Sequence, residues 1–266
     1  MEKKDIVVVV PVYRSVLSED EVISLAQCVK VLSGYSIVIV KPESLNVSFI
    51  LSEYPSLHIE TFPDQCFLSL RAYNKLVLDE NFYKRFMKYQ YMLIYQLDAY
   101  VFKDELLHWS NQGYDYIGAP WLPLKRRHLS LWGRNRLRLQ YSLYRLINSQ
   151  LLREDDKYYY YQVGNGGFSL RKISKMIEIT HFYEKKISDC LDDNKPFYPE
   201  DVFLLLELKS PKYRLRKPRY KEALKFSIEE NPAGAYDLNN RELPFGCHAW
   251  NHPYYSPFWL PIIKPE

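Results

Sequence analysis

The apolar residues of this chain form short continuous runs, separated by segments with helical spacing. Continuous apolar runs are typical of buried strands in a parallel sheet. The predicted strands are residues 6–10 (IVVVV), 35–40 (YSIVIV), 58–62 (HIETF) and 91–95 (YMLIY). Helices are predicted over 19–32, which Gly34 would stop, 68–78 and 82–89. This alternation predicts an α/β fold with a Rossmann-like, mostly parallel central sheet flanked by helices.

The segment 91–102 (YMLIYQLDAYVF) joins the clearest strand to an isolated charge. Its apolar run stops at Asp98 and resumes at Val101 and Phe102. Open α/β sheets bind their ligands beyond the carboxyl ends of the strands. An unpaired carboxylate buried there would cost roughly several kcal/mol. We therefore expect Asp98 to meet a partner, although a lone Asp after a strand is also a common turn former or helix cap.

The second half of the chain has less regular patterns. A strand and turn are expected over 114–121 (YDYIGAPW), a helix up to about Cys190, and another that opens at 197–203 (FYPEDVF). The tail over 244–266 is rich in Pro, Trp and Tyr and is expected to be irregular.

The stretch from Lys125 to Arg153 carries eight Lys and Arg residues and no acid, with apolar residues at three- and four-residue spacing. This pattern favours a basic helical insertion packed on the domain. A second hypothesis is that this helix makes a peripheral contact with anionic lipid, or grips the pyrophosphate of a lipid-linked acceptor.

Composition limits the class of protein. The chain of 266 residues is long enough to bury a substantial core. Its 24 Tyr, 13 Phe and 5 Trp suit stacking on sugars or bases, with a Tyr-rich core as the equal alternative. A net charge of +4 argues against nucleic-acid binding. The four dispersed cysteines argue against structural zinc and disulfides, and without a leader or spanning segment we expect a cytoplasmic protein.

Three further pieces carry candidate chemistry, and none is specific alone. The loop 164–167 (GNGG) lets a ligand approach the backbone, but it lacks the GxGxxG spacing and is equally a tight turn. Glu200 and Asp201 follow Pro199, which is the composition of a helix first turn. A carboxylate at that point can also act as a general base. His248 is a lone histidine without a partner at any characteristic spacing.

In order, the segments YQLDAYVF, GYDYIGAPW, VGNGGFSLR, PEDVF and PFGCHAW resemble the GT-A-fold glycosyltransferases. The resemblance is strongest to a bacterial family of glycosyltransferase-like proteins described as a domain of unknown function. It covers about Asp5 to Trp250, apart from the basic insertion over about 125–153. It implies one catalytic domain, with a nucleotide-binding half over about 1–103, an acceptor half over about 104–250 and a tail over 251–266.

The same resemblance implies the reaction and its partners. A sugar would pass from a nucleotide-sugar donor, expected to be UDP-linked, to a glycan or lipid-linked acceptor. The expected process is surface polysaccharide or glycoconjugate synthesis.

A divalent metal, Mn²⁺ or Mg²⁺, is also implied at the donor diphosphate. In GT-A enzymes the strand ends in an Asp-x-Asp motif; Asp98 matches its first Asp, but Tyr100 stands at the second. One carboxylate is a poor site for these ions. Either His248, which matches a C-terminal histidine of the family, shares the metal with Asp98, or the metal is weak or absent. In that second case the cations that would neutralise the diphosphate are Arg14, Arg71 and Arg171.

The remaining site residues follow from the resemblance. The donor nucleotide is expected to contact Pro11, Val12, Tyr13, Arg14, Arg71, Asn74, Gln96, Asp98 and Ala99, with Tyr13 stacked on the base. The donor sugar and the acceptor are expected to border Trp121, Asn165, Gly166, Gly167 and Glu200. Asp201, in an EDV motif like that of inverting enzymes, would deprotonate the acceptor hydroxyl.

Two other functions stay open. A sugar-nucleotide nucleotidyltransferase usually has a glycine-rich basic loop after the first strand, and residues 11–19 contain no glycine. A non-catalytic glycan-binding protein of the same fold is favoured by Tyr100 and disfavoured by Asp201 and His248.

Overall fold

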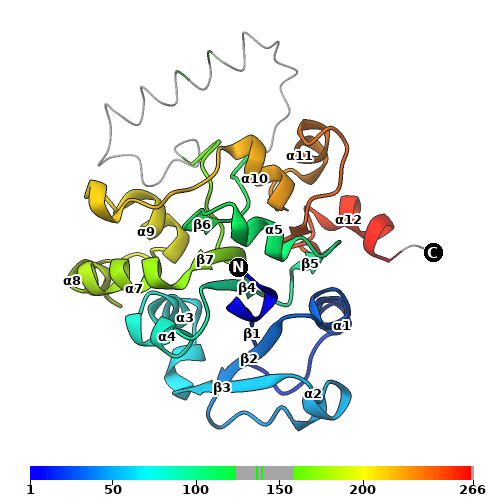
Figure 1. The fold of residues 1–266 in the computed structure, drawn as a ribbon, viewed down its shortest axis with the longest axis horizontal. Helices are drawn as coiled ribbons and strands as arrows, with labels where there is room; N and C mark the ends of the chain where they lie inside the picture. Colours follow the sequence, from blue (N-terminus) through cyan, green and yellow to red (C-terminus); the bar gives the residue numbers. More distant parts are fainter. Residues whose placement is uncertain (124–135, 137–138, 140–158, 265–266) are drawn as a thin grey trace.

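A six-stranded sheet forms the centre of the molecule (Figure 1). The computed structural model describes residues 1–123, 136, 139 and 159–264, and within them the sheet order is β3-β2-β1-β4-β7-β6. Its strands are β3 (His58–Phe62), β2 (Ser36–Pro42), β1 (Ile6–Pro11), β4 (Tyr91–Tyr95), β7 (Phe168–Lys172) and β6 (Tyr116–Ile117). The first four strands in this order are parallel, whereas β7 runs antiparallel to both β4 and β6. The predicted α/β class with a mostly parallel sheet is confirmed.

Helices cover both faces of this sheet. On one face lie α1 (Glu19–Leu32), α2 (Ser48–Glu53) and α5 (Leu106–Asn111). On the other lie α3 (Leu70–Val77), α4 (Glu80–Lys84), α7 (Ile173–Phe182), α8 (Glu184–Cys190) and α9 (Glu200–Leu206). Side chains alternate along a strand, so Val8 and Val10 of β1 face the first group, and Val7 and Val9 the second. All four are fully buried, which explains the unbroken apolar run.

The helix α1 has the bounds predicted from its periodicity. It begins with a capping box, in which Ser18 Oγ accepts from Glu21 N and Glu21 Oε2 accepts from Ser18 N at 2.8 Å. Glu19 and Asp20 place further negative charge at the positive end of the helix dipole. This arrangement fixes where the chain enters α1 after β1.

A second, small sheet joins β5 (Tyr100–Val101), which is green in Figure 1, to the C-terminal part of the chain, whose three helices are orange to red. The sheet order is β5-β9-β8, with β9 at Gly246–Cys247 and β8 at Ser227–Ile228. The helices are α10 (Tyr220–Phe226), α11 (Pro232–Leu238) and α12 (Ser256–Ile263).

The expectation of an irregular tail was therefore wrong. Trp250 and Trp259 are fully buried, and Trp259 of α12 stacks on Phe102 with ring centroids 5.5 Å apart. Large aromatic side chains that bury this much surface stabilise short elements which have no periodicity of their own.

One further predicted helix is shorter in the structure than expected, and another lies mostly outside the described residues. The helix expected over 82–89 ends at Lys84, and turns follow it. The short 3₁₀ helices are η1 (Lys3–Asp5), η2 (Asp64–Phe67) and η4 (Pro211–Tyr213). Apart from residues 136 and 139, the predicted basic helix over 125–153 lies outside the described residues. Within the described part of the chain, no helix has the length and apolar character needed to cross a membrane.

The sheet order creates a binding position beside β1. The chain moves from β1 outward to β2 and β3, and then crosses back to place β4 on the other side of β1. At such a reversal the loops after the two central strands diverge, which leaves a crevice at their carboxyl ends. The loops after β1 and β4 are the segments in which the sequence predicted donor contacts.

Candidate functional site

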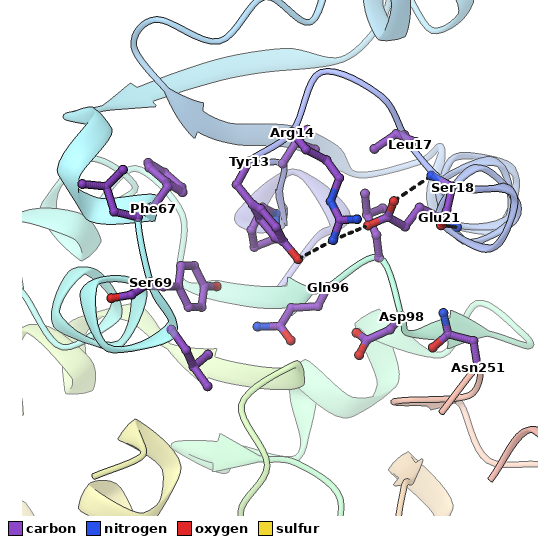
Figure 2. Close-up of a pocket in the computed structure, with 16 residues that line it drawn as sticks. Tyr13, Arg14, Leu17, Ser18, Glu21, Phe67, Ser69, Gln96, Asp98 and Asn251 are labelled. Carbon is purple, nitrogen blue, oxygen red and sulfur yellow. Dashed lines mark hydrogen bonds and ion pairs between the residues drawn. The ribbon is translucent and has the colours of Figure 1, made fainter. Parts of the chain in front are cut away.

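A cavity of about 660 Å³ lies at the carboxyl ends of β1 and β4 (Figure 2). Among the predicted donor residues, it is lined by Pro11, Val12, Tyr13, Arg14, Gln96 and Asp98. The sequence analysis missed its other lining residues, which are Leu17, Ser18, Glu21, Phe67, Leu68, Ser69, Leu70, Tyr73, Leu97 and Asn251. One available signal was that residues 67–70 follow β3, a strand parallel to β1 and β4, and so emerge at the same edge of the sheet.

Tyr13 and Arg14 give this cavity a flat ring and a positive charge (Figure 2). The Tyr13 side chain is 55% exposed, and the Arg14 guanidinium lies 5.0 Å from the centre of its ring. Arg14 Nη2 donates to Tyr13 Oη at 3.0 Å and lies 3.5 Å from Glu21 Oε1. An aromatic face next to a guanidinium suits a nucleobase or a phosphate group.

The other predicted donor residues do not line this cavity. Arg71 donates to the carbonyl oxygens of Asp192 and Lys195, each at 2.7 Å. Asn74 is buried and its Oδ1 accepts from Glu200 N at 2.6 Å, so it holds the first turn of α9. Ala99 is fully buried in the core. A sequence shows which residues are polar or small, but not which way each one faces from its helix or loop.

Asp98 meets a partner, as the sequence predicted, although its side chain is 39% exposed at the cavity. Its Oδ1 lies 3.0 Å from His248 Nε2, and Gln96 Oε1 lies 3.2 Å from the same nitrogen. Burial acts to raise the pKa of Asp98, but the charge and hydrogen bond of His248 hold this pKa below its ordinary value. Burial acts to lower the pKa of His248, but Asp98 and Glu229 raise it well above its ordinary value.

The donor atoms at this point fit a divalent metal held jointly with a diphosphate. Three possible ligand atoms lie together here: His248 Nε2 is 3.0 Å from Asp98 Oδ1 and 3.2 Å from Gln96 Oε1. In the described part of the chain, no three His, Cys, Asp or Glu side chains form a group that could hold an ion alone. Mg²⁺ and Mn²⁺ sites commonly use one or two protein carboxylates and complete the coordination with substrate phosphates and water.

Tyr100, which stands where the resemblance led us to expect a second Asp, packs into the C-terminal part of the molecule. The ring of Tyr100 packs against Phe102 and Trp250, with centroids 5.2 Å and 6.4 Å away. Tyr100 also pairs with Cys247 in the small sheet. This position therefore supports the C-terminal cluster of aromatic residues.

Gly167 allows the close approach of His248 to the main sheet. A Cβ at this position would overlap the His248 imidazole and would lie 2.6 Å from Gln96 Oε1. The Gly167 carbonyl also accepts from Gln96 N at 2.8 Å, so its backbone is fixed.

We therefore expect Gly167→Ala to displace His248 and Gln96 and to lower the free energy of unfolding by about 1–3 kcal/mol, the usual cost of overpacking a close-packed site. Urea denaturation measures this change. Gly34→Ala is the control, because a Cβ there meets only the flexible side chain of Lys3. Wild-type stability in Gly167→Ala would contradict the packing argument.

Arg171 and Glu200 form a buried ion pair beneath the glycine loop. Arg171 Nη2 lies 2.5 Å from Glu200 Oε1, its Nη1 donates to Tyr83 Oη, and its Nε donates to Ser169 Oγ. The Arg171 side chain is fully buried. The suggestion that Arg171 neutralises a diphosphate was wrong, because its guanidinium is enclosed by these partners.

Asp201 follows this ion pair in the first turn of α9. Burial raises its pKa to about 7, and the adjacent charge of Glu200 contributes in the same direction. Its Oδ1 accepts from Val202 N at 2.8 Å. Lys217, which the sequence analysis missed, is electrostatically coupled to Asp201, and burial lowers its pKa to about 8. A carboxyl with a pKa close to neutrality has the property that a general base needs.

The predicted acceptor residues come together in two packed loops. A Cβ on Gly164 would overlap the Trp121 ring, and Pro120 bridges to Val163. Asn165 has a left-handed backbone, with φ of 66°, and its Oδ1 accepts from Gly167 N. Gly166 lies against Glu200. The structure thus brings the loop 163–167 between Trp121, Glu200 and His248.

A family model with the description "Protein of unknown function (DUF5672)" matches residues 56–248. The chain belongs to this family. The matched range of the DUF5672 protein contains Asp98, the glycine loop and Asp201, and it ends at His248. No curated protein matches the sequence.

Solved structures of glycosyltransferases resemble this member of the DUF5672 family. The galactosyltransferase LgtC, solved in complex with donor and acceptor sugar analogs, is 11% identical, with a TM-score of 0.51 over 91% of this chain and 86% of that chain. A glycosyltransferase involved in glycosylation of the major capsid of PBCV-1 is 11% identical, with a TM-score of 0.48 over 91% and 92% of the two chains. The core-mannan synthase CmsA/Ktr4 from Aspergillus fumigatus, in its Mn/GDP form, is 11% identical, with a TM-score of 0.47 over 75% and 68%. The DUF5672 protein therefore has the GT-A glycosyltransferase fold.

Proposed function

We propose that this protein is a glycosyltransferase that moves a sugar from a UDP-linked donor to a glycan or lipid-linked acceptor. The observation that carries this proposal is the cavity at the carboxyl ends of β1 and β4, with Asp98 and His248 at its edge, on a GT-A fold. We place the reaction in surface polysaccharide or glycoconjugate synthesis.

The donor would occupy the cavity between β1 and β4. Tyr13 would stack on the base, and Arg14 would contribute positive charge near it. Asp98 and His248, with Gln96 beside them, would hold Mn²⁺ or Mg²⁺ together with the diphosphate. When bound, the ion supplies Lewis-acid stabilisation of the leaving group. The family's expectation of a metal is thereby compatible with the loss of the second motif Asp.

Asp201 would act as the general base of an inverting reaction. Such a reaction needs one base that accepts the proton of the acceptor hydroxyl as the oxygen attacks the anomeric carbon. A pKa of about 7 leaves a substantial fraction of Asp201 ionised at neutral pH and keeps it basic enough to accept a proton. Trp121 and Glu200, which border the glycine loop, would contact the donor sugar or the acceptor.

Nucleotide binding that depends on the metal is the first test. We expect calorimetry to show that Mn²⁺ strengthens UDP binding by the wild-type protein, because Asp98 and His248 would hold the ion beside the diphosphate and the ion would offset its charge. Asp98→Ala and His248→Ala should each lose this gain, about 10-fold or more, while binding in EDTA stays unchanged. Equal UDP affinity with Mn²⁺ and with EDTA in the wild type would remove the metal from the proposal.

A non-catalytic glycan-binding protein is the second candidate. It is favoured by Tyr100, whose ring packs into the C-terminal cluster instead of supplying a second carboxylate. A screen of nucleotide sugars separates the two, because a glycosyltransferase slowly hydrolyses its donor and a binding protein does not. Release of pyrophosphate from a sugar phosphate and a nucleoside triphosphate would instead indicate a nucleotidyltransferase.

A further inference from the structure

His248 contacts two carboxylates, one on each side of its ring. Its Nε2 faces Asp98 at 3.0 Å, and its Nδ1 lies 3.2 Å from Glu229 Oε2. Within the described residues, Nδ1 and Oε2 are both buried and neither forms a hydrogen bond to any further group, so the only polar atom that each one faces is the other. The sequence analysis did not single out Glu229.

The small sheet explains why these three side chains meet. In the parallel pair β8–β9, Ile228 pairs with Cys247, so the next residues along the two strands are Glu229 and His248. The His248 backbone N–H donates to the Ile228 carbonyl at 3.1 Å, which continues this register. On the other side of β9, the antiparallel pairing of Tyr100 with Cys247 places Asp98 next to the chain after His248, where Trp250 N donates to the Asp98 carbonyl. His248 therefore lies directly after the central strand β9, between the other two residues.

We infer that Glu229 is a positioning residue: its carboxylate faces His248 Nδ1–H and orients the ring, so that Nε2 faces Asp98 and would be the ring nitrogen available to a divalent ion held there. This inference rests on the proposed function, because it assigns a role to Glu229 at the proposed donor site. A histidine that binds a metal commonly donates its other ring N–H to a carboxylate, which fixes the tautomer and the ring orientation. Glu229 itself lies on the far side of the ring from Asp98, so both carboxylates do not bind the same ion.

Two further contacts restrict the ring to this orientation. The absence of a side chain at Gly167 leaves room for Nε2, while Gln96 Oε1 lies 3.2 Å from it. The His248 side chain is 12% exposed and that of Glu229 is 19% exposed, so water competes little for the Nδ1 contact. Removal of Glu229 would leave Nδ1 without a protein acceptor and would allow the other tautomer.

The test is the affinity of Mn²⁺, measured by electron paramagnetic resonance of the free ion in the presence of UDP. We expect Glu229→Leu to weaken Mn²⁺ binding about 10–100-fold. Glu229→Gln should recover most of this loss, because its amide oxygen still accepts from Nδ1–H. Glu230→Gln is the matched control, since it removes the same charge one residue further on, and it should leave Mn²⁺ affinity unchanged. Thermal unfolding of each variant checks that it folds.

The outcomes separate this inference from the proposed function. Wild-type Mn²⁺ affinity in folded Glu229→Leu overturns the positioning role while UDP binding persists. Equal losses in Glu229→Leu and Glu229→Gln overturn it too, because they indicate that charge and not the hydrogen bond matters. If Glu229→Leu weakens UDP binding in EDTA as strongly as in Mn²⁺, the residue supports the nucleotide site in general and the inference fails. A wild-type protein that binds neither UDP nor GDP contradicts the proposed function itself.

Discussion

Asp201→Asn is expected to lower the rate of sugar transfer by about 10²–10⁴-fold, the usual contribution of a general base. Asparagine keeps the size of the side chain and an oxygen that can accept from Val202 N, but it cannot accept the proton of the acceptor. UDP binding should be unchanged, because Asp201 does not line the donor cavity. Single-turnover transfer assays and calorimetry on the same variant measure the two effects.

The pH dependence of the transfer rate gives a second test of Asp201 as the general base. The raised pKa of about 7 means that the rate of the wild type should increase with pH through about 7, as the base becomes ionised. The free energy of unfolding changes with pH in the opposite direction to the rate. Because the folded state binds the proton more tightly than the unfolded state, the free energy of unfolding falls as pH rises from about 4 to about 7.

Asp201→Asn should remove that fall in stability. At pH 8 the variant is expected to be more stable than the wild type, by at most about 4 kcal/mol from about 1.4 kcal/mol per pKa unit. Urea denaturation at pH 4, 6 and 8 measures this difference. Asp193→Asn, which changes an exposed acid paired with Lys75, is the control.

Turnover at the wild-type rate in Asp201→Asn would falsify the inverting proposal.

The largest expected loss of stability is in Arg171→Met. This change removes the fully buried guanidinium and leaves the Glu200 carboxylate without its ion-pair partner. Breaking a buried pair in this way costs about 3–5 kcal/mol, because one charge remains without compensation. Urea denaturation followed by circular dichroism measures the loss.

A double variant tests the cause of this loss. Arg171→Met with Glu200→Gln should be more stable than Arg171→Met alone, because it no longer buries a single charge. Arg85→Met is the control; its partner is Glu60 and its side chain is 51% exposed, so the cost should be at most about 1 kcal/mol. Additive effects of the two buried changes would show that the pair does not couple.

The sequence by itself determined the four parallel strands of the central sheet and its first helix, whereas the antiparallel β7 was not predicted. The apolar runs of β1, β2 and β4 are continuous because both of their faces are covered. The bounds of α1 follow from a local capping box and the acids of its first turn. Such signals depend on neighbours within a few residues, and they are therefore readable without a structure. The parallel order also placed Asp98 at a strand end, where ligands bind.

The tertiary structure alone decided which side chains meet at the site. The strands β5, β8 and β9 are two residues each, too short to show any period, yet their pairing aligns Asp98, His248 and Glu229. The packing of α9 against β7 encloses Arg171 with Glu200, although the two residues lie far apart in the chain. These contacts join segments whose patterns contain no information about each other. The sequence specified the residues able to do chemistry, and the folded arrangement specified their partners, because burial and distance depend on the whole chain.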